Sequence, residues 1–83
     1  MKMQVIGSHV CPDTLYALHT LTAKGLDYDF VDISGSLAEL KTYLAVREGN
    51  PAIYDAVRAK GGVGIPCFVK EDGAITLNLE EVL

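Results

Sequence analysis

The residues with the clearest chemical potential lie in "HVCPDT", residues 9 to 14, where Cys11 directly precedes Pro12 and Thr14 follows three positions later. If a helix begins at the proline, its unpaired N–H groups and partial positive charge favour a thiolate on Cys11. Thr14 is placed to donate a hydroxyl hydrogen bond to that thiolate, whereas the Asp13 carboxylate opposes its ionisation. The pattern indicates a nucleophilic sulfur, and a buried, inert cysteine is the alternative.

A second chemical signal is "GVGIPCF", residues 62 to 68, in which Pro66 stands where a strand is predicted to begin. Proline in a strand pattern is typical of an edge, a strand start or a special peptide bond. Cys67 follows at once. If strand geometry starts there, alternation turns its side chain away from the face that Pro66 presents and favours burial. The alternative is that Cys67 resolves a mixed disulfide on Cys11.

The remaining polar candidates carry weaker signals. His9 lies two residues before Cys11 and either raises its thiolate fraction or faces solvent in a loop. His19 has no Cys or His at ligand spacing, so no metal is expected. Three aspartates on or beside one predicted strand are expected to face solvent: Asp27, Asp29 and Asp32.

Alternating strand and helix patterns position these residues. In chain order we predict a strand at 2–6, a helix at 12–24, a strand at 28–33, a helix after Ser36, a helix from Pro51, strands at 67–69 and 74–77, and a short helix after Asn78. On the first helix Leu15, Leu18 and Thr22 share one face, with Leu21 beside it. This order predicts an α/β fold, in which a four-stranded mixed sheet is flanked by helices on both faces.

Capping residues support the helix starts. "SLAE" reads as a capping box with Ser36 as N-cap and Glu39 at the third position. Asn50 is expected to cap the helix that begins at Pro51, because proline suits the first helical position. Asn78 is expected to cap the last helix, with Glu81 at its third position.

Length and composition limit the function. The 83 residues make one domain, 1–83, and its net charge of -4 with scattered Lys and Arg disfavours nucleic-acid or anionic-membrane partners. No apolar run is long enough to span a bilayer, and the N-terminus is too short in apolar residues for a secretory signal. We therefore expect a cytoplasmic monomer, whose two cysteines stay reduced.

Taken together, these motifs resemble those of the glutaredoxin family. "CPDT" stands where that family has CPYC, "GIP" where it has TVP, and the order of elements matches along the whole chain. The stretches "VREGNP" and "GIPCFV" are also similar to those of a small bacterial group called glutaredoxin-related proteins. The resemblance implies a thioredoxin fold with strand order 2-1-3-4, a nucleophilic Cys11 and a cis bond before Pro66. It also implies that the Ile65 backbone holds the substrate's cysteinyl group.

Three departures from the family change what the resemblance implies. Thr14 replaces the second active-site cysteine, so no disulfide can form within the motif. Ser8 occupies the place of a lysine that pairs with the glycyl carboxylate of glutathione. "TLNLEE" replaces the usual Gly-Gly and acidic residues, although Asn78 at a helix start still offers polar groups to a carboxylate.

The resemblance thus implies a monothiol glutaredoxin-like enzyme with Cys11 and Thr14 as catalytic residues. Pro12, Ile65, Pro66 and Asn78 would bind the substrate. Glutathione would be the co-substrate, and disulfide-bearing proteins the other partners. The alternatives are a non-catalytic thioredoxin-fold binding module, a glutathione transferase N-terminal-like domain, echoed by "GIPCFVKEDGAITL", and an iron–sulfur carrier of the monothiol type.

Overall fold

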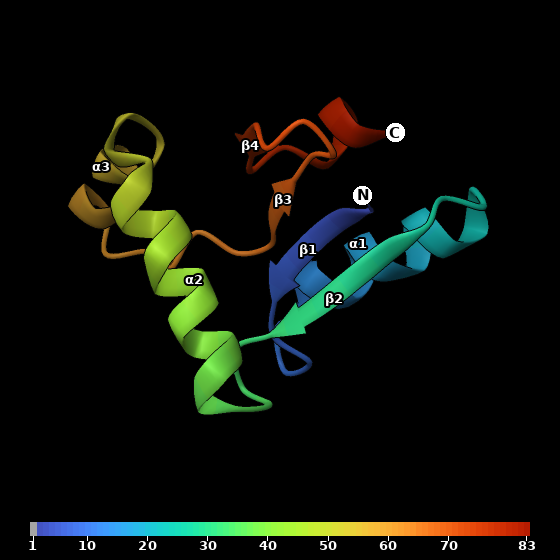
Figure 1. The fold of residues 1–83 in the computed structure, drawn as a ribbon, viewed down its shortest axis with the longest axis horizontal. Coiled ribbons are helices and arrows are strands. Elements are labelled where there is room, and N and C mark those ends of the chain that lie inside the picture. Colours follow the sequence, from blue (N-terminus) through green and yellow to red (C-terminus); the bar gives the residue numbers. More distant parts are fainter. Residues whose placement is uncertain (1) are drawn as a thin grey trace.

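Four strands form one mixed sheet in the order β2-β1-β3-β4 (Figure 1). The computed structural model describes residues 2–83, so Met1 of the predicted domain lies outside the described residues. The strands are β1 (Met3–Gly7), β2 (Tyr28–Asp32), β3 (Cys67–Val69) and β4 (Ile75–Thr76). β2 runs parallel to β1, whereas β3 is antiparallel to both β1 and β4. The predicted α/β class and the strand order 2-1-3-4 are confirmed.

Helices cover both faces of this sheet, as predicted. They are α1 (Pro12–Ala23), α2 (Leu37–Gly49), α3 (Pro51–Ala59) and the short 3-10 helix η1 (Leu79–Val82). Figure 1 shows α1 behind β1 and β2, with α2 and α3 on the other side of the sheet. No helix within residues 2–83 is long and apolar enough to cross a membrane.

Each face of the sheet has its own core, because side chains alternate along the strands. Val5 and Phe68 face α1 and pack with Ala17 and Leu21 of that helix. On the other face the buried core residues are Ile6, Tyr43, Tyr54 and Cys67, with Tyr43 contributed by α2 and Tyr54 by α3. The two cores hold helices of opposite faces against the same central strands.

The buried side of α1 differs from the predicted one. Leu21 is buried and Leu18 packs against the core, but Leu15 is 48 % exposed and Thr14 is fully buried. The reason is a close approach between the start of α1 and the end of β1. A Cβ on Gly7 would lie 2.4 Å from the Thr14 hydroxyl oxygen, so glycine makes room for that side chain.

The caps of α2 and α3 differ from the predicted ones in their hydrogen-bond partners. Ser36 caps α2 by accepting from the Glu39 N–H, as predicted, but the Glu39 carboxylate accepts from the Asp32 N–H at 2.7 Å and not from the backbone of the cap. Asn50 makes no side-chain cap for α3 and donates instead to the Val46 carbonyl at the end of α2. The Asn50 side chain therefore serves the C-terminus of α2 and not the N-terminus of α3.

Candidate active site

The strand register gathers the predicted functional segments at one end of the sheet. Gly7 at the end of β1 lies beside Asp32 at the end of β2, and Ile6 lies opposite Cys67 at the start of β3. The loop that leads to Cys11 follows Gly7 directly. Pro66 directly precedes Cys67, so the proline and the cysteine loop belong to neighbouring strand ends.

Cys11 is the N-cap residue of α1 and is partly exposed. Its N–H donates to the Ser8 carbonyl at 3.0 Å, which closes a turn over residues 8–11. Its own carbonyl accepts from the Leu15 N–H at 3.1 Å as the helix begins. The sulfur therefore lies beside the unpaired N–H groups of the first helical turn, where a thiolate is stabilised.

The surroundings of Cys11 lower the pKa of its thiol. The Thr14 hydroxyl hydrogen bond to the sulfur has the largest influence, and the backbone N–H groups of Thr14 and Asp13 add to it. Partial burial and the Asp13 carboxylate act in the opposite direction and do not outweigh these bonds. The opposing effects of Thr14 and Asp13, which sequence could not rank, therefore resolve in favour of the thiolate.

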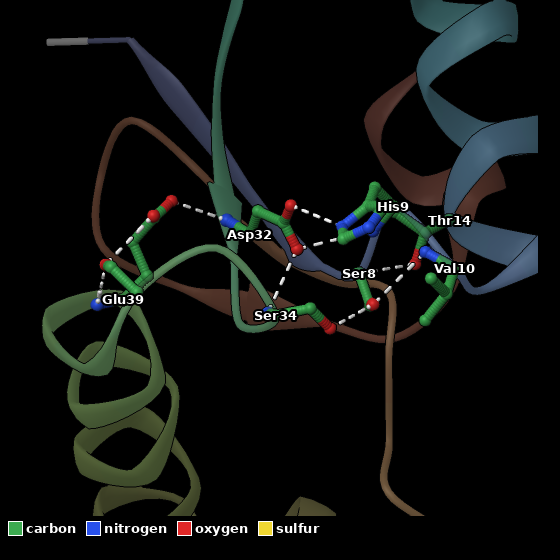
Figure 2. Close-up of polar contacts among 8 residues, drawn as sticks. Ser8, His9, Val10, Thr14, Asp32, Ser34 and Glu39 are labelled. Carbon is green, nitrogen blue, oxygen red and sulfur yellow. Dashed lines mark hydrogen bonds and ion pairs between the residues drawn. The ribbon is translucent and has the colours of Figure 1, made fainter.

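A polar network anchors the loop before Cys11 (Figure 2). Ser8 is buried, and its N–H donates to the Thr14 hydroxyl oxygen at 3.3 Å. Its own hydroxyl accepts from the Val10 N–H at 3.2 Å and lies 2.6 Å from the Ser34 hydroxyl. Because Thr14 accepts from Ser8, its hydroxyl hydrogen remains available to the Cys11 sulfur.

Asp32 holds the same loop from the end of β2 (Figure 2). One carboxylate oxygen lies 2.8 Å from the His9 ring nitrogen, and the other accepts from the N–H groups of His9 and Ser34 at 3.3 and 3.0 Å. Burial alone would raise the pKa of this carboxyl, but the bonds from Ser34 and His9 lower it overall. The expectation that Asp32 faces solvent is wrong, since its side chain is only 19 % exposed.

Two tyrosines fix the segment before Pro66. The Tyr43 hydroxyl donates to the Val63 carbonyl, and the Tyr54 hydroxyl donates to the next carbonyl, that of Gly64, at 3.0 Å. Their rings meet edge to face with centroids 6.3 Å apart. The two helices on this face thus hold consecutive carbonyls of one loop.

The Ile65–Pro66 peptide bond is cis, as the resemblance implies. Both residues are partly exposed. Gly64, just before them, has a φ of +76°, and a Cβ there would lie 2.4 Å from the Tyr54 ring. Only glycine combines this backbone conformation with contact to the tyrosine.

Cys67 lies in the core beneath the loop. It is fully buried beside Ile6, Tyr43 and Tyr54. Burial raises the pKa of its thiol, and the neighbouring Tyr54 hydroxyl counteracts this only in part. The side chain faces α2 and α3, whereas Thr14 packs on the opposite face, so alternation turns Cys67 away from the first turn of α1. The arrangement is that of a packing residue and gives no support to a resolving role.

Pro12 and Asn78 are both exposed, but they lie in different surroundings. Pro12 adjoins Cys11, whereas Asn78 follows β4, which β3 separates from β1. The Asn78 side chain caps η1 by accepting from the Glu80 N–H at 3.1 Å, one residue earlier than the predicted Glu81. A shallow pocket of about 460 Å³ adjoins Asn78. A larger pocket, of about 740 Å³, is lined in part by Met3 at the start of β1, which is the end of the strand away from Cys11.

Sequence reasoning missed Asp32, Ser34 and the two tyrosines as parts of this site. A signal for Asp32 was present, because parallel strands end at the same edge and both Asp32 and the Cys11 loop follow such ends. Within residues 2–83 no group of three or more His, Cys, Asp or Glu side chains is arranged to hold a metal ion.

Comparison with known proteins finds a relative in Haemophilus influenzae that is described only as an uncharacterized protein. It is 35 % identical over 75 residues, which cover 90 % of this chain and 86 % of the relative. The chain belongs to the same family as that protein. No family model matches the sequence. No solved structure matches it either.

Proposed function

We propose that this protein is a monothiol thiol–disulfide oxidoreductase of the glutaredoxin type, built on a thioredoxin fold. One observation carries the proposal: a partly exposed Cys11 lies at the N-terminus of α1, in surroundings that lower its pKa, beside the strand end that carries a cis proline. A lowered thiol pKa is typical of nucleophilic cysteines, whereas structural cysteines are buried and inert. The strand order β2-β1-β3-β4 is compatible with this fold.

In the proposed reaction the Cys11 thiolate attacks one sulfur of a disulfide. A new bond forms between Cys11 and that sulfur, the old disulfide bond breaks, and the other sulfur leaves as a thiolate that takes a proton from solvent. An external thiol, proposed to be glutathione, then attacks the mixed disulfide as its thiolate. When the attacked sulfur is that of a glutathionyl group, this step regenerates the Cys11 thiolate and releases oxidised glutathione, so the substrate cysteine is reduced and one external glutathione is oxidised in its place.

The chain's own residues have separate tasks in this scheme. Thr14 stabilises the thiolate before attack and again when Cys11 leaves the mixed disulfide, because the same hydrogen bond serves both steps. The backbone of the partly exposed Ile65 is proposed to pair with the substrate's cysteinyl residue as an added strand would. Cys67 takes no part, since its thiol is buried.

Glutathione recognition rests on a narrow set of groups. Ser8 stands at the position where glutathione-binding glutaredoxins have a lysine, and a serine carries no positive charge for a carboxylate. Its hydroxyl is also buried and bound to Ser34. The Asn78 side-chain oxygen is engaged by Glu80. The Ile65 backbone and Pro66 remain as contacts for glutathione, and we expect weak binding of the free tripeptide.

This weak recognition favours a second candidate, a thioredoxin-fold module that binds a partner without catalysis. The two functions differ in the chemistry of Cys11, because the module needs no thiolate. The deciding test is the reduction of a glutathionylated peptide with glutathione in excess. We expect turnover by the wild-type protein and by Cys67→Ser, and none by Cys11→Ser. Equal rates for Cys11→Ser and wild type would exclude an oxidoreductase that acts through Cys11.

A further inference from the structure

We propose that Asp32 is a positioning residue for Cys11, acting through the loop at residues 8–10. The inference rests on the proposed function in one respect, namely that Cys11 works as a thiolate. Asp32 stands 21 positions after Cys11 in the chain, and the register of β1 and β2 brings its backbone beside Gly7. No part of the catalytic motif in the sequence includes it.

Both carboxylate oxygens of Asp32 form hydrogen bonds to the loop at residues 8–10. One binds the His9 ring at 2.8 Å, and the other accepts from the His9 N–H, so both the side chain and the backbone of one residue are held. The carboxylate itself has little freedom, because the Ser34 N–H also donates to it and the Asp32 N–H is tied to Glu39. Hydrogen bonds to a charged acceptor are the stronger kind.

The same turn of chain contacts the loop a second time. The Ser34 hydroxyl lies 2.6 Å from that of Ser8, and Ser8 contacts Thr14 and Cys11 through its N–H and its carbonyl. A continuous path of hydrogen bonds thus runs from Asp32 and Ser34 to the two residues that carry the chemistry. Displacement of the loop moves the Ser8 N–H that orients the Thr14 hydroxyl (Figure 2).

The sign of the effect separates positioning from direct electrostatics. A carboxylate that acted on Cys11 through space would disfavour the thiolate, so its removal would lower the Cys11 pKa and speed alkylation. A carboxylate that holds the loop has the opposite effect, because its removal loosens the Thr14 hydrogen bond. The carboxylate whose charge acts on the Cys11 pKa is that of Asp13.

The test is the rate of iodoacetamide alkylation of Cys11 as a function of pH, followed by mass spectrometry of the Cys11 peptide in the intact, folded protein. Asp32→Ala should slow alkylation at neutral pH by about three- to tenfold, the worth of one ordinary hydrogen bond, and move the midpoint to higher pH. Asp29→Ala is the matched control on the same strand, where the carboxylate faces solvent beside Lys2. It should leave the profile unchanged.

Ser34→Ala provides a second test, because it removes a single hydroxyl from an exposed residue and should preserve the fold even if Asp32→Ala does not. It should slow alkylation in the same direction by a smaller factor. A merely structural role would lower the urea midpoint while the alkylation profile stayed in place, and that result, or faster alkylation, overturns the inference. If the wild-type protein exchanges disulfides but Asp32→Ala does not change the alkylation of Cys11, this inference alone is wrong. An Asp32 effect in a protein that exchanges no disulfide defeats only the proposed function.

Discussion

At the scale of single residues, the pKa of the Cys11 thiol depends on a neutral hydroxyl more than on a charge. The Thr14 hydrogen bond is the largest influence on its pKa, ahead of burial and of Asp13. Thr14 occupies the position of a second cysteine in the dithiol pattern, and its burial against Gly7 holds the hydroxyl in place. The placement of Cys11 and Thr14 at the start of α1 was predictable from residue type and spacing, because helix-start signals are local.

Thr14→Val tests this dependence. Valine fills similar volume but donates no hydrogen bond, so the Cys11 pKa should rise toward its ordinary value. Because thiolate then forms only at higher pH, the alkylation profile should shift upward and the rate at neutral pH should fall about three- to tenfold. Stability should also fall by about 1 kcal/mol, since the Ser8 N–H loses its acceptor.

Thr20→Val is the control on the same helix. Its hydroxyl bonds only to the Tyr16 carbonyl within α1, so the Cys11 profile should not move. An unchanged profile in folded Thr14→Val would show that the hydroxyl has no part in the thiolate's stabilisation.

At the scale of elements, loops on both faces of the sheet are held by side chains from distant helices and strands. The type of each strand and helix, and its start to within one residue, were predictable from periodicity and from residues typical of helix starts. The contacts of Asp32, Tyr43 and Tyr54 were not, because they depend on which elements lie side by side. Asn50 is a similar case, since its side chain donates to the Val46 carbonyl of α2 and makes no cap for α3.

Gly64→Ala tests the contact between the proline segment and α3. Alanine there combines a positive φ with a Cβ placed 2.4 Å from the Tyr54 ring, so it should destabilise the protein by more than about 1 kcal/mol. Gly61→Ala is the matched control, because Gly61 has a φ of +72° and open space around its Cβ. The difference between their urea midpoints isolates the cost of the clash with the Tyr54 ring. Equal midpoints would show that the loop moves away from the ring without a measurable loss of stability.

Tyr54→Phe tests whether that contact serves the reaction. The ring remains, but the Gly64 carbonyl loses its donor, at a cost of about 1 kcal/mol in stability. Since the segment before Pro66 is proposed to hold substrate, KM for a glutathionylated peptide should rise while the alkylation rate of Cys11 stays the same. Tyr28→Phe, whose hydroxyl bonds only to the exposed Thr22, should change neither quantity. A slower alkylation of Cys11 in Tyr54→Phe would contradict this separation of roles.

At the scale of the whole molecule, a small domain keeps one sulfur partly exposed, that of Cys11, and the other, that of Cys67, in the core. A chain of this length has little stability to spare, because it buries a modest share of its surface. The two small cores lie on opposite faces of the sheet, and both include residues of β1 and β3. Loss of either core would therefore remove packing from the same two strands.

Phe68→Ala tests how far the fold depends on these central strands. Phe68 is fully buried between β1 and α1, and truncation of such a side chain costs about 3 to 5 kcal/mol. This is comparable to the whole stability of a small domain, so the variant should be largely unfolded at 37 °C by circular dichroism. A cooperative, wild-type-like melting curve would show that the α1 core carries little of the stability.

The most direct test of a reactive Cys11 is mass spectrometry of the protein after exposure to oxidised glutathione at neutral pH, first folded and then unfolded in urea. The folded protein should take one glutathione, mapped to Cys11, because Cys67 is buried and its thiol pKa is raised. The unfolded protein, at higher pH, should take a second one on Cys67, which shows that the reagent reaches both thiols. A folded protein that remains unmodified, or that carries its adduct on Cys67 instead, would contradict the account.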